Sequence, residues 1–259
     1  MGTFLFDKII FGPIQSRRLG VSLGVNLLPV DGKLCSFNCI YCECGLNEQR
    51  RTRSKLPSRE EVNKALREKL EEMRSDNMAP DVITFAGNGE PTLHPEFAGI
   101  IDDTIQARND YFPKAKIAVL SNSTTLHKED VFQALNKIED NIMKLDSVLD
   151  SRIRQIDVPN SPNFNFNSLL QQLSRFEGNV IIQTMFLKGI YKGESVDNTT
   201  EEEIHGWLDA LKIIRPKQVM IYTLDRDTPV TGLEKIPVSR LNEIAERARK
   251  EGWDVQVSG

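Results

Sequence analysis

The sequence predicts an α/β protein made of six consecutive strand–helix units. Two observations lead to this fold class: six short apolar runs recur along the 259 residues, and an amphipathic, charged segment follows each of them. Such alternation is typical of a parallel sheet covered by helices. Six units are fewer than the eight of a closed barrel, so an open partial barrel and a doubly wound sheet both fit the pattern.

The predicted strands are nearly continuous in Val, Ile and Leu, as is typical of strands buried on both faces. They cover residues 21–28, 82–86, 116–120, 141–146, 179–187 and 217–224. In both candidate folds the functional residues follow the carboxyl ends of the strands, so we expect the site there.

The predicted helices lie between and after these strands. Ser58 and Glu61 form a capping-box pattern before an apolar face that begins at Val62. Thr200 and Glu203 repeat the pattern before a second such helix. Four further helices are predicted over residues 95–108, 127–138, 164–176 and 238–251.

The composition is that of an ordinary folded protein. Hydrophobic residues make up 39% of the chain, which is enough for a core and argues against disorder. No run of 18 apolar residues exists, so no membrane span is expected. The charged N-terminus does not resemble a signal peptide, and we expect a cytoplasmic protein. The net charge of −4 argues against a broadly basic surface for nucleic acid.

The four cysteines all lie within ten residues, at Cys35, Cys39, Cys42 and Cys44. A disulfide scaffold would spread its cysteines along the chain, so this clustering indicates metal binding or redox chemistry. Zinc usually takes two separated pairs of ligands, and a redox pair such as Cys39 and Cys42 usually opens a helix directly after a strand. Three thiolates on one loop can instead bind three irons of an iron–sulfur cluster.

The spacing C-x3-C-x-aromatic-C, with Tyr41 as the aromatic residue, resembles the radical S-adenosylmethionine (SAM) superfamily. The resemblance implies that Cys35, Cys39 and Cys42 bind a [4Fe–4S] cluster, whose fourth iron is chelated by the amino and carboxylate groups of SAM. It places Tyr41 among the cofactor-binding residues. Cys44 lies outside the pattern and is expected not to be a ligand.

The stretch from Gly87 to Pro91 resembles the Gly-Gly-Glu-Pro motif of that superfamily. The resemblance implies that Gly89 and Glu90 hold the methionine amino group of SAM. Asn88 replaces the first glycine of the pair. We expect this change to be mild, because Asn is the residue that best replaces Gly where φ is positive.

The ends of the later strands resemble the SAM contacts of the superfamily more loosely. Each of these polar residues could instead be an ordinary cap of a strand or helix. The candidates are Ser121 and Asn122 after the third strand, Lys144 and Asp146 after the fourth, Gln183 in the fifth and Tyr222 in the sixth.

The segment 12–26, which reads GP-x-x-SRRLG-x-SLG-x-N, resembles one branch of the superfamily. Its members are described as iron–sulfur oxidoreductases and neighbour the wyosine-forming tRNA enzymes. The resemblance implies one radical SAM domain over residues 1–259 with the fold of a partial (β/α)6 TIM-like barrel. Its core would span 9–225, with the cluster loop at 30–50 and a C-terminal extension at 226–259.

The activity implied by the resemblance is reductive cleavage of SAM to a 5′-deoxyadenosyl radical, which abstracts hydrogen from an unidentified substrate. A peptide, a protein or tRNA would suit the open side of a partial barrel. An external one-electron donor such as flavodoxin or ferredoxin is expected, because the chain has no further cysteine or flavin motif. The alternatives are an electron-transfer or cluster-carrier protein without SAM chemistry, and a zinc-stabilised interaction module.

Two basic segments have both a functional and a structural interpretation. Arg17 and Arg18 could hold a phosphate or carboxylate of the substrate, or could pair with acidic residues at the rim of the barrel. The run 48–55 has four cations in six positions and could contact RNA, although such a run is more often a solvated loop.

Overall fold

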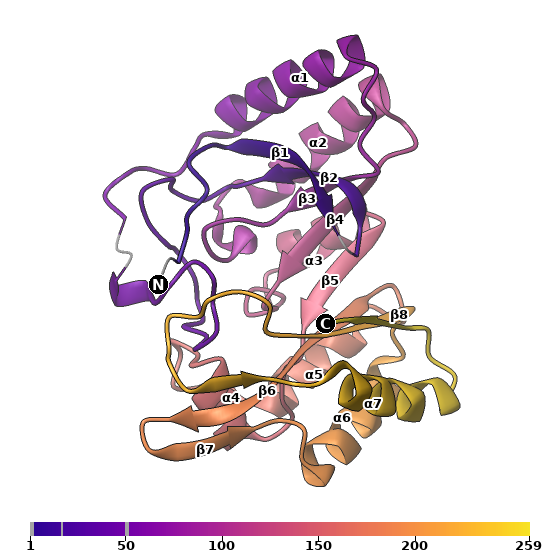
Figure 1. Ribbon diagram of the computed structural model, residues 1–259. Helices are drawn as coiled ribbons and strands as arrows, with labels where there is room; N and C mark the ends of the chain where they lie inside the picture. The colour runs from indigo at the N-terminus through magenta and orange to yellow at the C-terminus, as the bar shows by residue number, and fades with distance from the viewer. Residues whose placement is uncertain (1–2, 17, 50–51) are drawn as a thin grey trace.

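The computed structural model describes residues 3–16, 18–49 and 52–259, which form one ten-stranded sheet with helices packed against it (Figure 1). Along the sheet the strands follow the order β1-β2-β3-β4-β5-β6-β8-β10, and β7 and β9 pair with β6. Arg17, Arg50 and Arg51, which belong to the two basic segments, lie outside the described residues.

The six predicted strands are all present, and they are parallel to one another. They are β2 (Gly20–Val25), β3 (Val82–Phe85), β4 (Lys116–Ser121), β5 (Asp140–Lys144), β6 (Ile181–Tyr191) and β8 (Gln218–Thr223). Because they lie side by side in sequence order, right-handed connections place every covering helix on the same face of the sheet. The sheet curls into a half-barrel, which confirms the partial TIM-like fold and excludes the doubly wound alternative.

Four strands were not predicted. β1 (Ile10–Ser16) is antiparallel to β2 at one edge, and β10 (Val255–Ser258) extends the parallel sheet beyond β8 at the other edge. β7 (Glu194–Asp197) and β9 (Leu233–Lys235) pair with the far end of β6. All four are short or half-exposed and therefore lack the continuous apolar run that identified the others.

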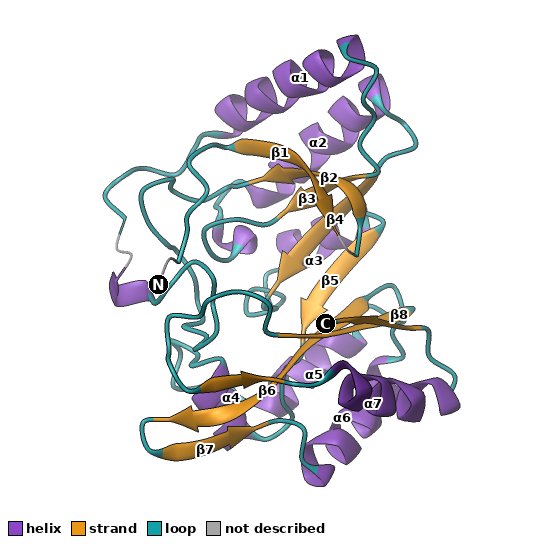
Figure 2. Ribbon diagram, in the orientation of Figure 1, coloured by secondary structure: helices purple, strands orange, loops and turns teal. Residues whose placement is uncertain are grey.

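The predicted helices are all present on the outer face (Figure 2). They are α1 (Arg59–Ser75), α2 (Phe97–Tyr111), α3 (Glu129–Asn136), α5 (Phe166–Ser174), α6 (Glu201–Ile214) and α7 (Val238–Lys250). The short helix α4 (Asp150–Ile156) and the 3-10 turns η1 (Asn47–Gln49) and η2 (Pro91–Leu93) were not predicted.

The two predicted capping boxes differ in outcome. At α1, Ser58 and Glu61 make both reciprocal hydrogen bonds. At α6, the Thr200 side chain accepts a hydrogen bond from the Glu203 amide, but the Glu203 side chain does not accept one from the Thr200 amide. The Glu203 carboxylate instead accepts hydrogen bonds from the Ser147 hydroxyl at 2.7 Å and the Val148 amide at 3.1 Å, because it is buried against the chain after β5.

The main core lies between the outer face of the sheet and the helices. Leu23, Ile83 and Ile117 from the strands pack there with Leu66 and Leu70 of α1. A smaller apolar cluster covers the inner face and consists of Val82, Ala118, Ile142, Ile181 and Met220. Among the described helices, none combines the length and the apolar character needed to cross a membrane.

Candidate cofactor site at the carboxyl ends of the strands

The loop that carries the cysteines leaves β2 and crosses the carboxyl ends of the neighbouring strands. The Leu34 amide donates to the Asn88 carbonyl at 2.9 Å, and the Glu90 amide donates to the Leu34 carbonyl at 3.0 Å. Farther along, the Ile40 amide donates to the Ile156 carbonyl of α4 at 2.9 Å. The loop is therefore attached at one end to the turn after β3 and at the other to the helix after β5.

All four cysteines are free thiols, but their environments differ. Cys35, Cys39 and Cys42 are half-buried, whereas Cys44 is 8% exposed and its sulfur lies 3.4 Å from the Gly87 carbonyl oxygen. A hydrogen bond from Cys44 lowers the pKa of Cys42 to about 6, although burial opposes this change. Three half-buried thiols beside one buried thiol could supply three ligands to an iron–sulfur cluster and leave its fourth iron without a protein ligand.

One metal ion would need a different arrangement. Within residues 3–16, 18–49 and 52–259, no three His, Cys, Asp or Glu side chains are placed to hold an ion between them. A zinc ion needs all its ligands at 2.0–2.3 Å from a single centre. The thiolates of a [4Fe–4S] cluster bind separate irons and therefore lie farther apart.

Lys33 is a charged neighbour of the cysteines that the sequence did not indicate. It is 5% exposed, and its ammonium donates to the Gly45 carbonyl at 2.8 Å. Burial lowers the pKa of Lys33, but the electrostatic influence of Cys42, Cys35 and Cys39 outweighs this effect and the net pKa is raised. A lone Lys in a loop is normally solvent-exposed, so the sequence held no signal for this position.

Gly89 allows the turn after β3 to approach the cysteine loop. Its φ is +136°, and a Cβ atom at this position would lie 1.9 Å from the Leu34 carbonyl oxygen. Gly87 is also restricted, since its Cβ would lie 2.3 Å from the Asn26 amide oxygen. Both glycines are therefore required by close packing of the backbone.

Asn88 has a different role from the one expected. It is not among the residues with positive φ, so the sequence-based explanation for Asn at this position was wrong. Its fully buried side chain donates to the carbonyls of Phe6 and Pro29, both at 2.9 Å, and accepts from the Phe6 amide at 2.8 Å. Asn88 thus ties the N-terminal segment to the turn through its side-chain amide.

Glu90, Ser121 and Asn122 form one buried cluster at the ends of β3 and β4. Glu90 is 2% exposed and accepts hydrogen bonds from the Ser121 hydroxyl at 2.8 Å and the Asn122 amide at 2.7 Å. Thr92 adds donations from its amide and hydroxyl. Burial raises the pKa of Glu90, although these hydrogen bonds oppose the shift. Both carboxylate oxygens are therefore occupied by donors from the chain.

This cluster reaches the cysteine loop through Asn122. The Asn122 side-chain nitrogen lies 3.6 Å from the Cys35 sulfur and donates to the Ser36 hydroxyl at 2.9 Å. The Phe37 amide also donates to the Cys35 sulfur at 3.4 Å. Cys35 is thus a sulfur with two nitrogen donors, one of them from the end of β4.

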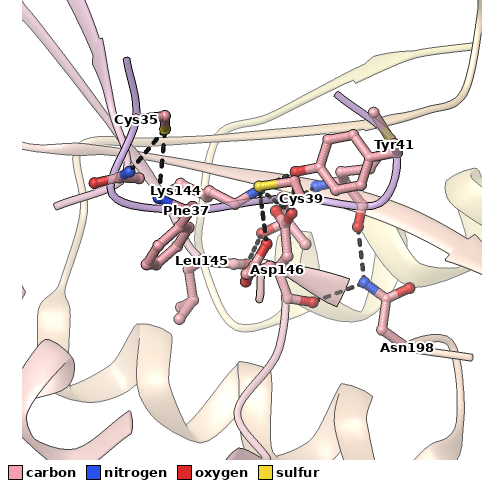
Figure 3. Close-up of polar contacts among 12 residues, drawn as sticks. Cys35, Phe37, Cys39, Tyr41, Lys144, Leu145, Asp146 and Asn198 are labelled. Atoms are coloured by element: carbon pink, nitrogen blue, oxygen red, sulfur yellow. Dashed lines mark hydrogen bonds and ion pairs between the residues drawn. The ribbon is translucent and has the colours of Figure 1, made fainter. Parts of the chain in front are cut away.

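Lys144 lies under the cysteine loop at the end of β5 (Figure 3). Its ammonium contacts the Tyr41 hydroxyl and the Asp146 carboxylate, and it lies 3.1 Å from the Asp157 carboxylate. The Cys39 thiol lies 3.7 Å from the same Asp157 oxygen. Burial lowers the pKa of Lys144, but Asp146 and Asp157 outweigh it, so the pKa is raised well above its ordinary value.

Asp157 is a member of this group that the sequence did not indicate. Burial raises its pKa to about 7, although Lys144 opposes the shift. It caps the carboxyl end of α4 and does not directly follow a strand, where the candidate site residues were expected. Asp146 is further fixed by the Met185 amide, which donates to its carboxylate at 2.9 Å, and by Asn198, which donates to its carbonyl at 2.7 Å (Figure 3).

Gln183 and Tyr222 lie on the inner face of the half-barrel. Gln183 is the register partner of Lys144 on β5 and of Met220 on β8, so these side chains point the same way. Tyr222 comes two residues after Met220. Burial raises the pKa of Tyr222 to about 12, so its hydroxyl is protonated at neutral pH.

The fold and the site together define the class of protein: a half-barrel with a three-thiol loop across the carboxyl ends of its parallel strands. The family model of the radical SAM superfamily matches residues 30–147, which contain this loop and the strand ends after β3, β4 and β5. A UPF0026 protein of Helicobacter pylori is 31% identical over 222 residues, which cover 84% of this chain and 67% of that protein. The chain therefore belongs to the UPF0026 proteins, and its residues 30–147 carry the radical SAM superfamily domain.

Three other proteins are similar to this chain over most of its length. A GTPase Obg of Brachyspira hyodysenteriae is 31% identical over 86% of this chain, which spans only 31% of that protein. A radical SAM methyltransferase from Sphaerobacter thermophilus has a TM-score of 0.66 at 15% identity, covering 92% of this chain and 65% of that one. A structure of TYW1 with a lysine-pyruvate adduct bound has a TM-score of 0.61 at 16% identity, and the match covers 90% of this chain and 74% of the TYW1 chain. These structures share the fold.

Proposed function

We propose that this chain is a radical SAM enzyme that holds a [4Fe–4S] cluster on Cys35, Cys39 and Cys42. The observation that carries the proposal is the separation of the cysteines into three half-buried thiols and the withdrawn Cys44, at the carboxyl ends of parallel strands. When bound, the cluster and SAM supply one-electron cleavage of the SAM sulfonium and hydrogen abstraction from a substrate. The last strand joins the same sheet as the first, so we take residues 1–259 as one domain.

The chain offers polar groups for SAM on both sides of the cysteine loop. On one side, Gly89 brings the turn close to the loop, and Glu90 holds Ser121 and Asn122 in place. The Oε2 atom of Glu90 accepts from the Asn122 amide and, as a carboxylate oxygen, could accept a second hydrogen bond from an amino group. Glu90 would then bind SAM and position its neighbours at the same time.

On the other side, Tyr41, Lys144 and Asp146 form the second candidate group. Lys144 is held protonated by its carboxylate neighbours and would serve as a cation and hydrogen-bond donor. Gln183 and Tyr222 line the inner face below it. The burial of these groups would exclude water from the reacting atoms.

The proposal includes two partners. An external one-electron donor such as flavodoxin or ferredoxin would reduce the cluster, because the chain has no cysteine outside the loop. The substrate would enter at the open side of the half-barrel, where a peptide, a protein or tRNA has room. The run 48–55, which could contact RNA, is described only in part.

Anaerobic reconstitution with iron and sulfide tests the proposal. The wild-type protein should hold about four irons and, with dithionite and SAM, should form 5′-deoxyadenosine. Cys35→Ala, Cys39→Ala and Cys42→Ala should each lose the cluster, while Cys44→Ala, the matched control, should retain it. One bound zinc without sulfide would contradict the cluster, and a cluster that never cleaves SAM would indicate an electron carrier.

A further inference from the structure

Arg18 lies in the turn between β1 and β2, at the amino end of the half-barrel, yet its guanidinium is directed to the inner face. Its Cζ atom lies 4.6 Å from the centre of the Tyr222 ring on β8. The Gln256 side chain of β10 donates to the Arg18 carbonyl at 3.4 Å, so the turn is also attached to the opposite edge of the sheet. Arg18 therefore bridges the two edges of the open barrel.

The interior beside Arg18 is hollow. A cavity of about 700 Å³ lies at the amino ends of the strands, and its lining includes Arg18, Val82 and Met220. The lining is also charged, with Lys114 and Lys116 beside the carboxylates of Asp81, Asp140 and Asp254. Val82 and Met220 belong to the inner-face cluster, and Tyr222 follows Met220 by two residues. The guanidinium thus lies between this cavity and Tyr222, which is near the carboxyl end of β8.

One nitrogen of the half-buried Arg18 side chain lacks a hydrogen-bond partner among the described residues. This nitrogen is the Nη1 atom, which is itself buried. The face of the Tyr222 ring stabilises the positive charge but offers no acceptor in the plane of the N–H groups. A buried donor without an acceptor is unfavourable, and the unfilled position marks where an acceptor from a ligand would sit.

Two other cations, Arg74 and Lys144, pair with carboxylates, whereas no carboxylate pairs with Arg18 among the described residues. Arg74 of α1 stacks on Tyr111 in the same way, with 4.9 Å from its Cζ to the ring centre, but it pairs with Glu71 at 2.6 Å. Lys144, another cation near Tyr222, is paired with two carboxylates. Among the described residues, the Arg18 guanidinium stacks on Tyr222 and its Nη1 atom has no acceptor.

We propose that Arg18 and Tyr222 form a binding site for an oxyanion of the substrate, a carboxylate or a phosphate, inside the half-barrel. The planar guanidinium offers two parallel N–H groups to such an anion, and the Tyr222 hydroxyl adds a third donor. The substrate of this enzyme is therefore an acidic molecule whose charged end enters the barrel. The assignment of the anion to the substrate rests on the proposed function, whereas the anion site itself needs neither cluster nor SAM.

The test measures binding of two probes, inorganic phosphate by ³¹P NMR and ¹³C-labelled acetate by ¹³C NMR, to the cluster-loaded protein. Wild-type protein should bind at least one probe, and the one bound more tightly identifies the anion. Arg18→Gln should weaken that binding by about 10-fold or more, with Arg18→Lys intermediate. Arg74→Gln, the matched control for a stacked arginine, should bind like wild type. No binding by wild type, or equal binding by Arg18→Gln, overturns the proposal.

Two further measurements separate this proposal from the function. Tyr222→Phe keeps the ring beneath Arg18 but removes the hydroxyl, so it should weaken binding even if Arg18→Gln does not fold. The variant with Cys35, Cys39 and Cys42 all changed to Ala should bind the anion as wild type does, even if no SAM chemistry is found. Displacement of the probe by SAM would assign Arg18 to the SAM carboxylate and overturn its assignment to the substrate.

Discussion

The side-chain nitrogen of Asn122 lies 3.6 Å from the sulfur of Cys35, and it joins the end of β4 to the cysteine loop. Asn122 also takes part in the Glu90 cluster through its backbone amide. A single residue thus connects a thiol expected to bind iron with the turn expected to bind SAM. A change at Asn122 is therefore expected to affect both the proposed cluster ligand Cys35 and the proposed SAM-binding turn.

Asn122→Leu should lower the reduction potential of the bound cluster. Hydrogen bonds to cluster sulfurs stabilise the reduced, more negative state, so losing one makes reduction harder. A redox titration followed by electron paramagnetic resonance would measure the shift. Ser36→Ala, which removes a partner of Asn122 and leaves the contact with sulfur, is the control. An unchanged potential in Asn122→Leu would show that this contact does not tune the cluster.

Gly89→Ala should destabilise the attachment of the cysteine loop. The new Cβ would lie 1.9 Å from the Leu34 carbonyl oxygen, and φ is +136°, so the backbone must shift. We expect a loss of about 1–3 kcal/mol in the free energy of unfolding, together with lower iron content. Gly193→Ala is the control, because that glycine also has positive φ but no atom within 4 Å of the new Cβ. Equal losses in both variants would attribute the effect to φ alone.

Lys144→Met should lower the stability of the apoprotein by about 3–5 kcal/mol, because it leaves Asp146 and Asp157 buried without their cation. Urea denaturation measures the change. Lys188→Met removes a half-exposed lysine 3.5 Å from Glu234 and should cost less than about 1 kcal/mol. A small loss in Lys144→Met would mean that the two carboxylates tolerate each other without it.

Glu203 should make the stability depend on pH. Burial raises its pKa in the folded state, so between pH 4.5 and that raised value the folded state binds more protons than the unfolded state. Its contribution to the free energy of unfolding is therefore present at low pH and falls as the pH rises through this window. Glu203→Gln should remove that part of the slope in urea denaturations from pH 4 to 7. Glu202→Gln, at the exposed neighbouring position, should retain it.

Much of the site followed from the chain order of the strands. The carboxyl ends of consecutive parallel strands meet at one edge, so Glu90 after β3 and Ser121 and Asn122 after β4 had to come together. The same reasoning predicted Lys144 and Asp146 at this edge, whereas their contact with Tyr41 was found only in the structure. The spacing of the cysteines indicated which three are candidate ligands, and the assignment itself stays a prediction until the cluster is measured.

Other members of the site carry no local signal. Lys33 and Asp157 read as surface charges, and only the crossing of the cysteine loop buries them. Asn88 matched a position expected to need positive φ, yet its side chain binds a segment more than 80 residues earlier in the chain. Edge strands such as β10 bury one face at most, so their apolar pattern is too weak to identify.

By itself, the sequence predicted the alternation of parallel strands with helices and the three-cysteine loop, because apolar periodicity and ligand spacing are local properties of the chain. The residue pattern left a doubly wound sheet equally possible, and the half-barrel was implied by the resemblance to the radical SAM superfamily and confirmed by the structure. Only the tertiary structure decided which charges are compensated. It paired Lys144 with two carboxylates and left the Arg18 guanidinium stacked on Tyr222 with a buried nitrogen unsatisfied. Whether a charge has a partner depends on which distant segments meet it, and that is set by the packing of the whole chain.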